Sequence, residues 1–480
     1  MSLLQFITSF IYDSNELILV QKKITRRRAI SSAVAAGAVV GVGILAGVGG
    51  YFAGASTGGR VETIIQKETV TVGGQTVTVT NTVTQPTTVT ATVTGPVGPV
   101  KPVVIGYTLP KTGAFAANGV IHDIADQVAV RRINDTGGFL GRPVERLVYD
   151  DRSDISQIPP LYERLITQDK VDLIVGPYAT PFIAAAMPVA EKYRKVYIFD
   201  SYTLPKRATY EFAFSSWATG YNTDIEWPTL LFEALQNSAG KLPKTLVVVH
   251  STHPGAAFVA SGVPQVAEKF GIEVLDVIKY ELGTTDFLPI ATRLKELKPE
   301  FVFQGGLVLD ESNLRQALDK AGFIPYGHSS LWPAVGAMLG LGALGDGLIS
   351  QSVFEAHMPF THDAEARYFV ENYQKLAREA GLAYWKADTQ GGTSYAMFQI
   401  LREAVRGSNS LNDEDIGNWL KKNKVDTIFG ELTFDGPNNY GPMKTWIAQI
   451  QKGEQIIVWP PDYAKPGSRL QYPSPLAKGY

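Results

Sequence analysis

The stretch VDLIVGPYATPFIAAAMPVAEKYRKVYIFDSYTLP (residues 171–205) has the pattern of a strand, a helix and a second strand. Its first apolar run ends at Gly176, and a helical pattern begins at Thr180, which is followed directly by a proline. A Thr followed by Pro is a typical helix start, because the hydroxyl caps and the proline lacks an N–H that would stay unpaired. The second apolar run ends at Asp200. This order predicts two parallel strands joined by a helix.

The same alternation continues on both sides of this stretch, in two successive runs. It predicts an α/β protein of two lobes, each with a parallel sheet covered by helices on both faces. Strands are expected at 103–109, 145–151, 171–176, 195–200, 245–250, 272–280 and 301–306. Helices are expected at 117–135, 158–169, 180–194, 222–238, 255–270, 286–297 and 311–322. Further helices are expected within 363–422, and short strands at 428–435, 445–451 and 455–460.

The composition excludes several classes of function. The chain of 480 residues has a net charge of −2, so a nucleic-acid partner is not expected. It has no cysteine, which excludes disulfides, thiol nucleophiles and cysteine-ligated metals. The six histidines lack the spacing of a zinc-peptidase motif, and no P-loop or G-x-S-x-G elbow is present. The neighbouring Asp150 and Asp151 are interpreted as a solvated strand end and a helix cap. We therefore expect no enzyme activity, no metal and no cofactor.

The N-terminal 56 residues have the features of an export signal or membrane anchor. Five basic residues between Lys22 and Arg28 precede an uncharged run at 29–56, longer than the about 20 residues that a membrane-spanning helix needs. This order predicts that the N-terminus stays inside and the rest of the chain lies outside the cell. Retention as an anchor is favoured, and cleavage at 53–55 is the alternative.

Residues 57–101 are rich in threonine and valine and end in glycine and proline. We interpret them as an extended extracellular stalk. Alternation of the two residue types is also compatible with a strand. Residues 461–480 are interpreted as a Pro-rich tail.

Small polar groups follow three of the expected strands. They lie in the segments 108–119 and 201–205 and at the corner before Thr180. Parallel sheets place ligands at the carboxyl ends of their strands. At Thr180, free backbone N–H groups and the helix dipole suit a carboxylate. The alternative is that the Thr180 hydroxyl only caps its helix.

Five segments carry a family resemblance. They are IGYTLPKTGAFAANG (105–119), RRINDTGGFLGRPVERLVYDDRSD (131–154), DKVDLIVGPYATPFIAAAMPVAEKY (169–193), TTDFLPIATRLKELKPEFVFQGG (284–306) and FGELTFD (429–435). Together, over about 102–460, they resemble the solute-binding proteins of ABC importers for branched-chain amino acids, the Leu/Ile/Val-binding type. The resemblance implies a two-lobed type I periplasmic-binding (Venus-flytrap) fold with a three-stranded hinge, closing around a small ligand. The implied first lobe is 102–220 with about 355–430, and the second is 221–354 with about 431–460.

The resemblance also implies ligand-binding positions. Thr180 matches a Ser or Thr that receives the ligand's α-carboxylate, and Ser201 and Thr203 match a backbone contact and a hydroxyl. The full set of expected ligand-binding residues is Thr112, Phe115, Asn118, Thr180, Ser201, Tyr202, Thr203, Leu307, Asp310 and Trp332.

The other half of the site departs from the family. Aromatic side chains of the family are absent at Asn118, Pro254 and Leu307, and the acid that faces the ligand ammonium is not kept beside Trp332. An unpaired ammonium in a closed cleft is costly. Either another acid serves, or the ligand is not a standard amino acid. The candidate acids are Asp200, Glu226 and Asp310. Trp217, Trp332 and Trp385 are candidates for lining an aromatic pocket, with core packing as the alternative.

The expected function is a monomeric, surface-anchored receptor that delivers a small ligand to the permease and ATPase subunits of an ABC importer. The expected ligand is an amino acid or a related carboxylate or amide. The alternative is a ligand-sensing or surface module with the same fold and no part in transport.

Overall fold

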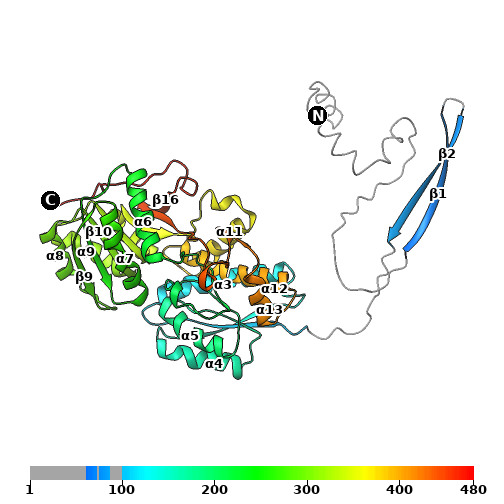
Figure 1. Cartoon of the computed structure of the whole chain (residues 1–480), viewed down its shortest axis with the longest axis horizontal. Helices are drawn as coiled ribbons and strands as arrows, with labels where there is room; N and C mark the ends of the chain where they lie inside the picture. The colour runs from blue at the N-terminus through cyan, green and yellow to red at the C-terminus, as the bar shows by residue number, and fades with distance from the viewer. Residues whose placement is uncertain (1–60, 73–74, 87–99) are drawn as a thin grey trace. The chain divides into compact units, whose positions relative to one another are not determined.

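The structure is a computed structural model that describes residues 61–72, 75–86 and 100–480 (Figure 1). The expected membrane anchor at 1–56 lies outside the described residues. Across the ranges that are described, no helix has both the length and the apolar character needed to cross a membrane. Contacts divide the chain into two units, Met1–Pro96 and Val97–Tyr480.

The N-terminal unit contains an antiparallel hairpin. Its strands are β1 (Val61–Val72) and β2 (Gln75–Pro86), and their register places Val61 opposite Pro86. This part of the expected stalk therefore folds back on itself instead of running extended. Threonine and valine are β-branched and favour strands, which accounts for the pairing.

The first lobe of the larger unit is built on a parallel sheet with the strand order β4-β3-β5-β6-β7. Helix α3 packs against α11 and α12, and α4 packs against α5. Figure 1 shows these two groups of helices on opposite sides of the sheet. The strands are β3 (Val103–Leu109), β4 (Val144–Asp150), β5 (Leu173–Val175), β6 (Tyr197–Phe199) and β7 (Ala213–Ser215). The helices are α3 (Ala116–Asp135), α4 (Ile158–Thr167), α5 (Thr180–Lys192), α11 (Ala364–Glu379), α12 (Thr389–Ser408) and α13 (Asp413–Leu420). The short pair β13 (Val425–Thr427) and β14 (Gly430–Leu432) follows α13.

The second lobe repeats this strand order and adds two antiparallel strands, giving β16-β15-β12-β11-β10-β8-β9. Its strands are β8 (Thr245–Ser251), β9 (Glu273–Tyr280), β10 (Phe301–Val308), β11 (Gly327–Pro333), β12 (Leu348–Ser352), β15 (Trp446–Gln451) and β16 (Glu454–Trp459). Its helices are α6 (Thr223–Asn237), α7 (Pro254–Lys269), α8 (Leu288–Leu297), α9 (Asp310–Ala321) and α10 (Val335–Gly340).

Strand β8 shows how this sheet is buried on both faces. Leu246 and Val248 belong to the large core that includes α6 and α7, whereas Val247 and Val249 belong to a separate core with α8 and α9. Successive side chains of a strand point to opposite faces. An uninterrupted apolar run is therefore what a strand between two helical layers requires.

Three strands, β7, β11 and β12, have no clear signal in the sequence. Strand β11 is buried throughout, yet its sequence is Gly-His-Ser-Ser-Leu-Trp-Pro. Two of its side chains find partners on neighbouring strands: His328 Nε2 lies 2.8 Å from Gln304 Oε1, and Ser330 Oγ donates to the Ile349 carbonyl at 3.4 Å. Because these partners lie far away in sequence, hydropathy does not reveal the strand.

Residues 461–480 are not a free tail, as their proline content suggested, but part of the second lobe. Leu470 and Tyr472 are buried. The Tyr480 ring stacks on Tyr326 with 4.0 Å between centroids, and the Tyr480 hydroxyl donates to the Pro299 carbonyl at 3.0 Å. Aromatic side chains anchor this segment despite its prolines.

Three connections join the two sheets: β7 to α6, β12 to α11, and β14 to β15. Residues from Val97 onward nevertheless form one compact unit. The expected lobe boundaries therefore stay predictions.

Gly176 stands at the end of β5 where a side chain has no room. A Cβ at this position would lie 2.4 Å from the Phe199 Cβ, and the Gly176 N–H donates to the Ile198 carbonyl at 2.7 Å. We expect Gly176→Ala to lower the free energy of unfolding by about 1–3 kcal/mol, because overpacking forces the strands apart. Urea denaturation measures this change. The control Gly340→Ala, whose added Cβ meets no atom within 4 Å, should lower stability by far less. Equal stability of the two variants would show that the corner tolerates a side chain.

Candidate functional site

A small cavity of about 10 Å³ lies between the two lobes, where strands of both sheets end. In each lobe the order of the first strands reverses beside the cavity, which is the position that open α/β sheets use for ligands. The first lobe contributes Tyr178, Thr180, Ser201, Trp217 and Gln390, and the second lobe contributes His253, Leu307 and Trp332.

Thr180 is the first residue of α5, and its hydroxyl does not cap that helix. The hydroxyl donates to the Ser201 carbonyl at 2.8 Å and lies 3.3 Å from Thr203 Oγ1. The Thr203 N–H donates back to Thr180 Oγ1 at 3.4 Å. The capping interpretation is therefore wrong: Thr180 links two strand ends beside the cavity. A rotation about its Cβ–Oγ1 bond would turn the same hydrogen toward a ligand.

His253 lines the cavity from the second lobe and was not singled out in the sequence. It precedes α7, and its Nδ1 accepts a hydrogen bond from the Ala256 N–H at 3.4 Å. Its exposed fraction is 2%, and burial lowers the pKa of the imidazole to about 4. The ring is therefore neutral at pH 7 and carries its proton on Nε2, which has no hydrogen-bond partner within residues 100–480.

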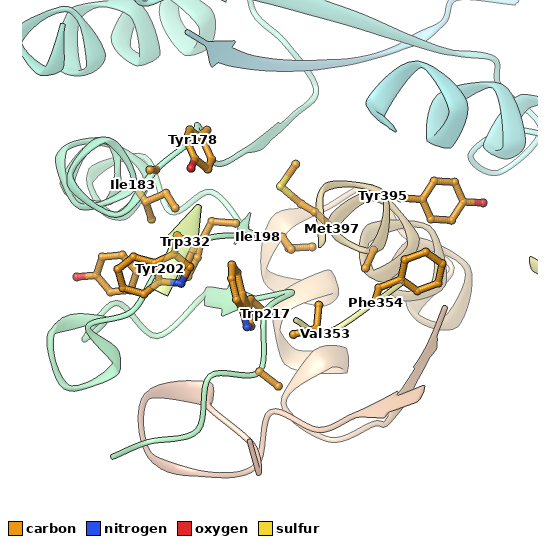
Figure 2. Packing of buried hydrophobic residues seen from close by; sticks show 14 of the residues in the cluster. Tyr178, Ile183, Ile198, Tyr202, Trp217, Trp332, Val353, Phe354, Tyr395 and Met397 are labelled. Atoms are coloured by element: carbon orange, nitrogen blue, oxygen red, sulfur yellow. The ribbon is translucent and has the colours of Figure 1, made fainter. Parts of the chain in front are cut away.

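Two tryptophans lie at the centre of the site. Trp217 and Trp332 both line the cavity and a second small space of about 10 Å³ that adjoins it. Figure 2 shows both rings among buried side chains of the two lobes. Trp217 Nε1 donates to Thr445 Oγ1 at 3.2 Å, whereas Trp332 Nε1 has no acceptor in the described part of the chain. Trp385, the third candidate, does not line the cavity. Its ring packs against the Arg378 guanidinium, whose Cζ lies 3.6 Å from the ring centroid.

Asp200 is paired with a neighbouring histidine. One of its oxygens lies 2.9 Å from His122 Nδ1, and the other accepts from the Ser201 hydroxyl at 2.9 Å. Burial lowers the pKa of His122, but Asp200 outweighs this effect and the pKa is raised. His122 Nε2 lies 3.2 Å from Gln390 Oε1, so the pair also orients a cavity side chain.

The other two candidate acids lie outside the cavity lining. Asp310 accepts from the Tyr280 hydroxyl at 2.8 Å and the Leu307 N–H at 3.2 Å, and burial raises its pKa to about 6. Glu226 accepts from the Asn222 N–H at the start of α6 at 3.0 Å. Among the residues that line the cavity with Thr180, none is an acid.

Asp388 is the acid of the adjoining space. It caps α12 by accepting from the Gln390 and Gly391 N–H groups at 3.1 and 3.3 Å. Burial raises its pKa to about 6.

The loop at 110–115, between β3 and α3, is held in place by hydrogen bonds from its own polar groups to nearby carboxylates. Thr112 is exposed, and its hydroxyl donates to Asp150 at 2.8 Å rather than lining the cavity. Asp151 is fully buried and accepts from Thr108 Oγ1 and the Ser153 N–H, both at 3.0 Å. The expectation of a solvated strand end is therefore wrong for Asp151. These two carboxylates fix the loop.

No group of acids and histidines in the described ranges is arranged to hold a metal ion.

Other expected residues lie behind the cavity. Asn118 donates to the Tyr178 hydroxyl, and Phe115 packs edge-on against Tyr178 at 6.1 Å between centroids. Tyr202 is buried, and its carbonyl accepts from the Tyr440 hydroxyl at 3.3 Å. They position Tyr178 and the segment before Thr203 without lining the cavity themselves. Tyr178 was missed because the resemblance assigned no role to it.

Comparison with known proteins agrees with this architecture. The family model described as "Periplasmic binding protein" matches residues 102–455. The leucine-, isoleucine-, valine-, threonine- and alanine-binding protein of Pseudomonas aeruginosa is 22% identical over 343 residues, which cover 68% of this chain and 84% of that protein.

Two solved structures share the fold. One is a branched-chain amino acid transporter substrate binding protein of Streptococcus pneumoniae in complex with isoleucine, with a TM-score of 0.61 and 19% identity. It covers 74% of this chain and 98% of its own. The other is an ABC transporter solute binding protein of Rhodopseudomonas palustris in complex with benzoate, with a TM-score of 0.62 and 17% identity. It covers 74% of this chain and 95% of its own.

These findings confirm the expected α/β type I periplasmic-binding fold with parallel sheets. Members of the family are substrate-binding proteins of ABC transporters rather than enzymes, and they work outside the cytoplasm. The chain belongs to the periplasmic binding protein family.

Proposed function

We propose that this chain is the solute receptor of an ABC importer and captures a small carboxylate between its two lobes. The observation that carries the proposal is that Thr180 and His253 line the same cavity. Each comes from a different lobe, and each stands at the N-terminus of a helix. Helix N-termini present free N–H groups and a positive dipole end, which favour an anion.

Ligand capture and lobe closure are coupled in this proposal. A ligand shifts a conformational equilibrium only by its differential affinity for the two states. A carboxylate that contacts Thr180 in one lobe and His253 in the other gains its full set of contacts only when the lobes are closed. The closed form is then the form that delivers the ligand to the permease.

The relation to the membrane is part of the same proposal. The basic residues and the uncharged run at 29–56 would hold the receptor at the outer face of the cytoplasmic membrane, or would be removed after export. The receptor would act there as a monomer beside its permease and ATPase subunits.

Tryptophan fluorescence tests ligand capture directly, because Trp217 and Trp332 line the cavity. Titration with leucine, isoleucine, valine, benzoate and isocaproate should give a saturable change with at least one of these carboxylates. Trp332→Phe should reduce the amplitude, whereas Trp385→Phe, outside the cavity, should leave it intact. A complete lack of saturable change across the panel would contradict the proposed function.

A further inference from the structure

We infer that the ligand of this cleft is a carboxylate without an α-ammonium group, and that His253 binds it from the second lobe through an Nε2–H donor. The inference rests on the proposed function and narrows its ligand class.

The cavity offers no partner for an α-ammonium. In an α-amino acid the ammonium is bonded to the carbon beside the carboxylate, so both charges share one cavity. No charged side chain lines the cavity that contains Thr180. Asp200 is paired with His122 and Ser201, and Asp388 belongs to the adjoining space. A buried ammonium without an acid is strongly disfavoured.

The helix termini around the cavity also disfavour a cation. A Cβ added to Gly255 in the first turn of α7 would lie 2.5 Å from Thr203 Oγ1 and 3.4 Å from Thr180 Oγ1. The N-termini of α5 and α7 therefore meet across the cleft. Both dipoles present their positive ends to the ligand, which attracts a carboxylate and repels an ammonium.

Two buried donors in the cavity lack acceptors. His253 Nδ1 already accepts from the Ala256 N–H, so the neutral ring carries its hydrogen on Nε2. The exposed fraction of His253 is 2%, and Nε2 has no partner within residues 100–480. Trp332 Nε1 is likewise buried and has no partner among the described residues, and an indole N–H can only donate. A buried donor without an acceptor is costly, and a carboxylate oxygen supplies the acceptor that each one lacks.

Ligand pairs that differ only in the ammonium test the inference. Isocaproate is leucine without its ammonium, and hydrocinnamate is phenylalanine without its ammonium. Isothermal titration of the full chain should give at least one deaminated member an affinity about tenfold or more above that of its amino acid. Equal or tighter binding of both amino acids would overturn the inference and leave the proposed function standing. If no member of either pair binds, and isoleucine, valine and benzoate do not bind either, the proposed function is overturned as well.

Two variants test the part assigned to His253. His253→Ala should weaken the preferred carboxylate about tenfold or more, the loss of a hydrogen bond to a charged group. His253→Gln keeps an N–H donor near the Nε2 position and should restore the affinity to within about threefold of wild type. Thermal melting verifies that both variants fold. A purely structural role for His253 would predict equal losses in the two variants, and this outcome would overturn the assignment.

Discussion

Replacing Thr180 by valine is expected to weaken carboxylate binding about 10- to 100-fold. Valine matches threonine in shape but lacks the hydroxyl that stands beside the cavity at the start of α5. A hydrogen bond to a charged group contributes about 1.5–3 kcal/mol, which corresponds to this loss. Isothermal titration with the ligand that binds wild type most tightly measures the change.

Thr180→Ser is the matched control, because it keeps the hydroxyl and removes only a methyl group. We expect it to bind within about fivefold of wild type, since one methyl group contributes about 1 kcal/mol at most. The valine variant also loses the hydrogen bond to the Ser201 carbonyl, so its stability should fall by about 1 kcal/mol. Wild-type affinity in Thr180→Val would remove Thr180 from the site.

The second large effect is expected from Gly255→Ala, which should obstruct closure of the lobes. The added methyl group would lie 2.5 Å from Thr203 Oγ1 of the opposite lobe. Overpacking of this kind costs about 1–3 kcal/mol, so ligand affinity should fall about 5- to 150-fold. Alanine is the better helix former, so α7 itself should not be destabilised. Small-angle scattering with saturating ligand should show a larger radius of gyration than wild type.

A second substitution verifies the cause of this effect. Thr203→Ala removes the oxygen that the new methyl group would meet. The double variant with Gly255→Ala should therefore regain the compact liganded form in scattering. Gly340→Ala, which adds a methyl group into open space, should scatter like wild type. A compact liganded form in Gly255→Ala alone would show that the lobes do not approach at this point.

Much of the fold could be predicted because its strands are buried on both faces. Apolar runs such as β8 and β10 are typical of strands that lie between two helical layers, and amphipathic helices separate such strands in the sequence. Strand β11 could not be predicted because it carries Ser and His side chains, and the partners of His328 and Ser330 lie 24 and 19 residues away in the sequence. The packing of residues 461–480 against the second lobe was not predicted, because the prolines suggested a tail. Tyr472 and Tyr480 anchor the segment through contacts with Phe301 and Tyr326.

The sequence predicted cavity residues in both lobes, Thr180 and Ser201 in the first and Leu307 and Trp332 in the second, but not His253. Thr180 and Ser201 are adjacent to strand ends and carry a local signal, a hydroxyl before a helix or after a strand. His253 has such a signal as well, since it separates β8 from a proline that starts α7. The sequence nevertheless predicts no role for it, because the spacing of the histidines bears only on metal binding. His253 is neutral because it is buried, and its Nε2 carries the hydrogen because Nδ1 accepts from the Ala256 N–H. Both facts depend on the folded structure and cannot be seen in the sequence.

A crystal structure of the protein with its preferred carboxylate tests the central claim most directly. We predict one carboxylate oxygen within about 3.2 Å of Thr180 Oγ1 and the other within about 3.2 Å of His253 Nε2. No acidic side chain should contact the ligand in that cavity. A ligand bound elsewhere, or one whose ammonium is paired with Asp388 in the adjoining space, would contradict the account.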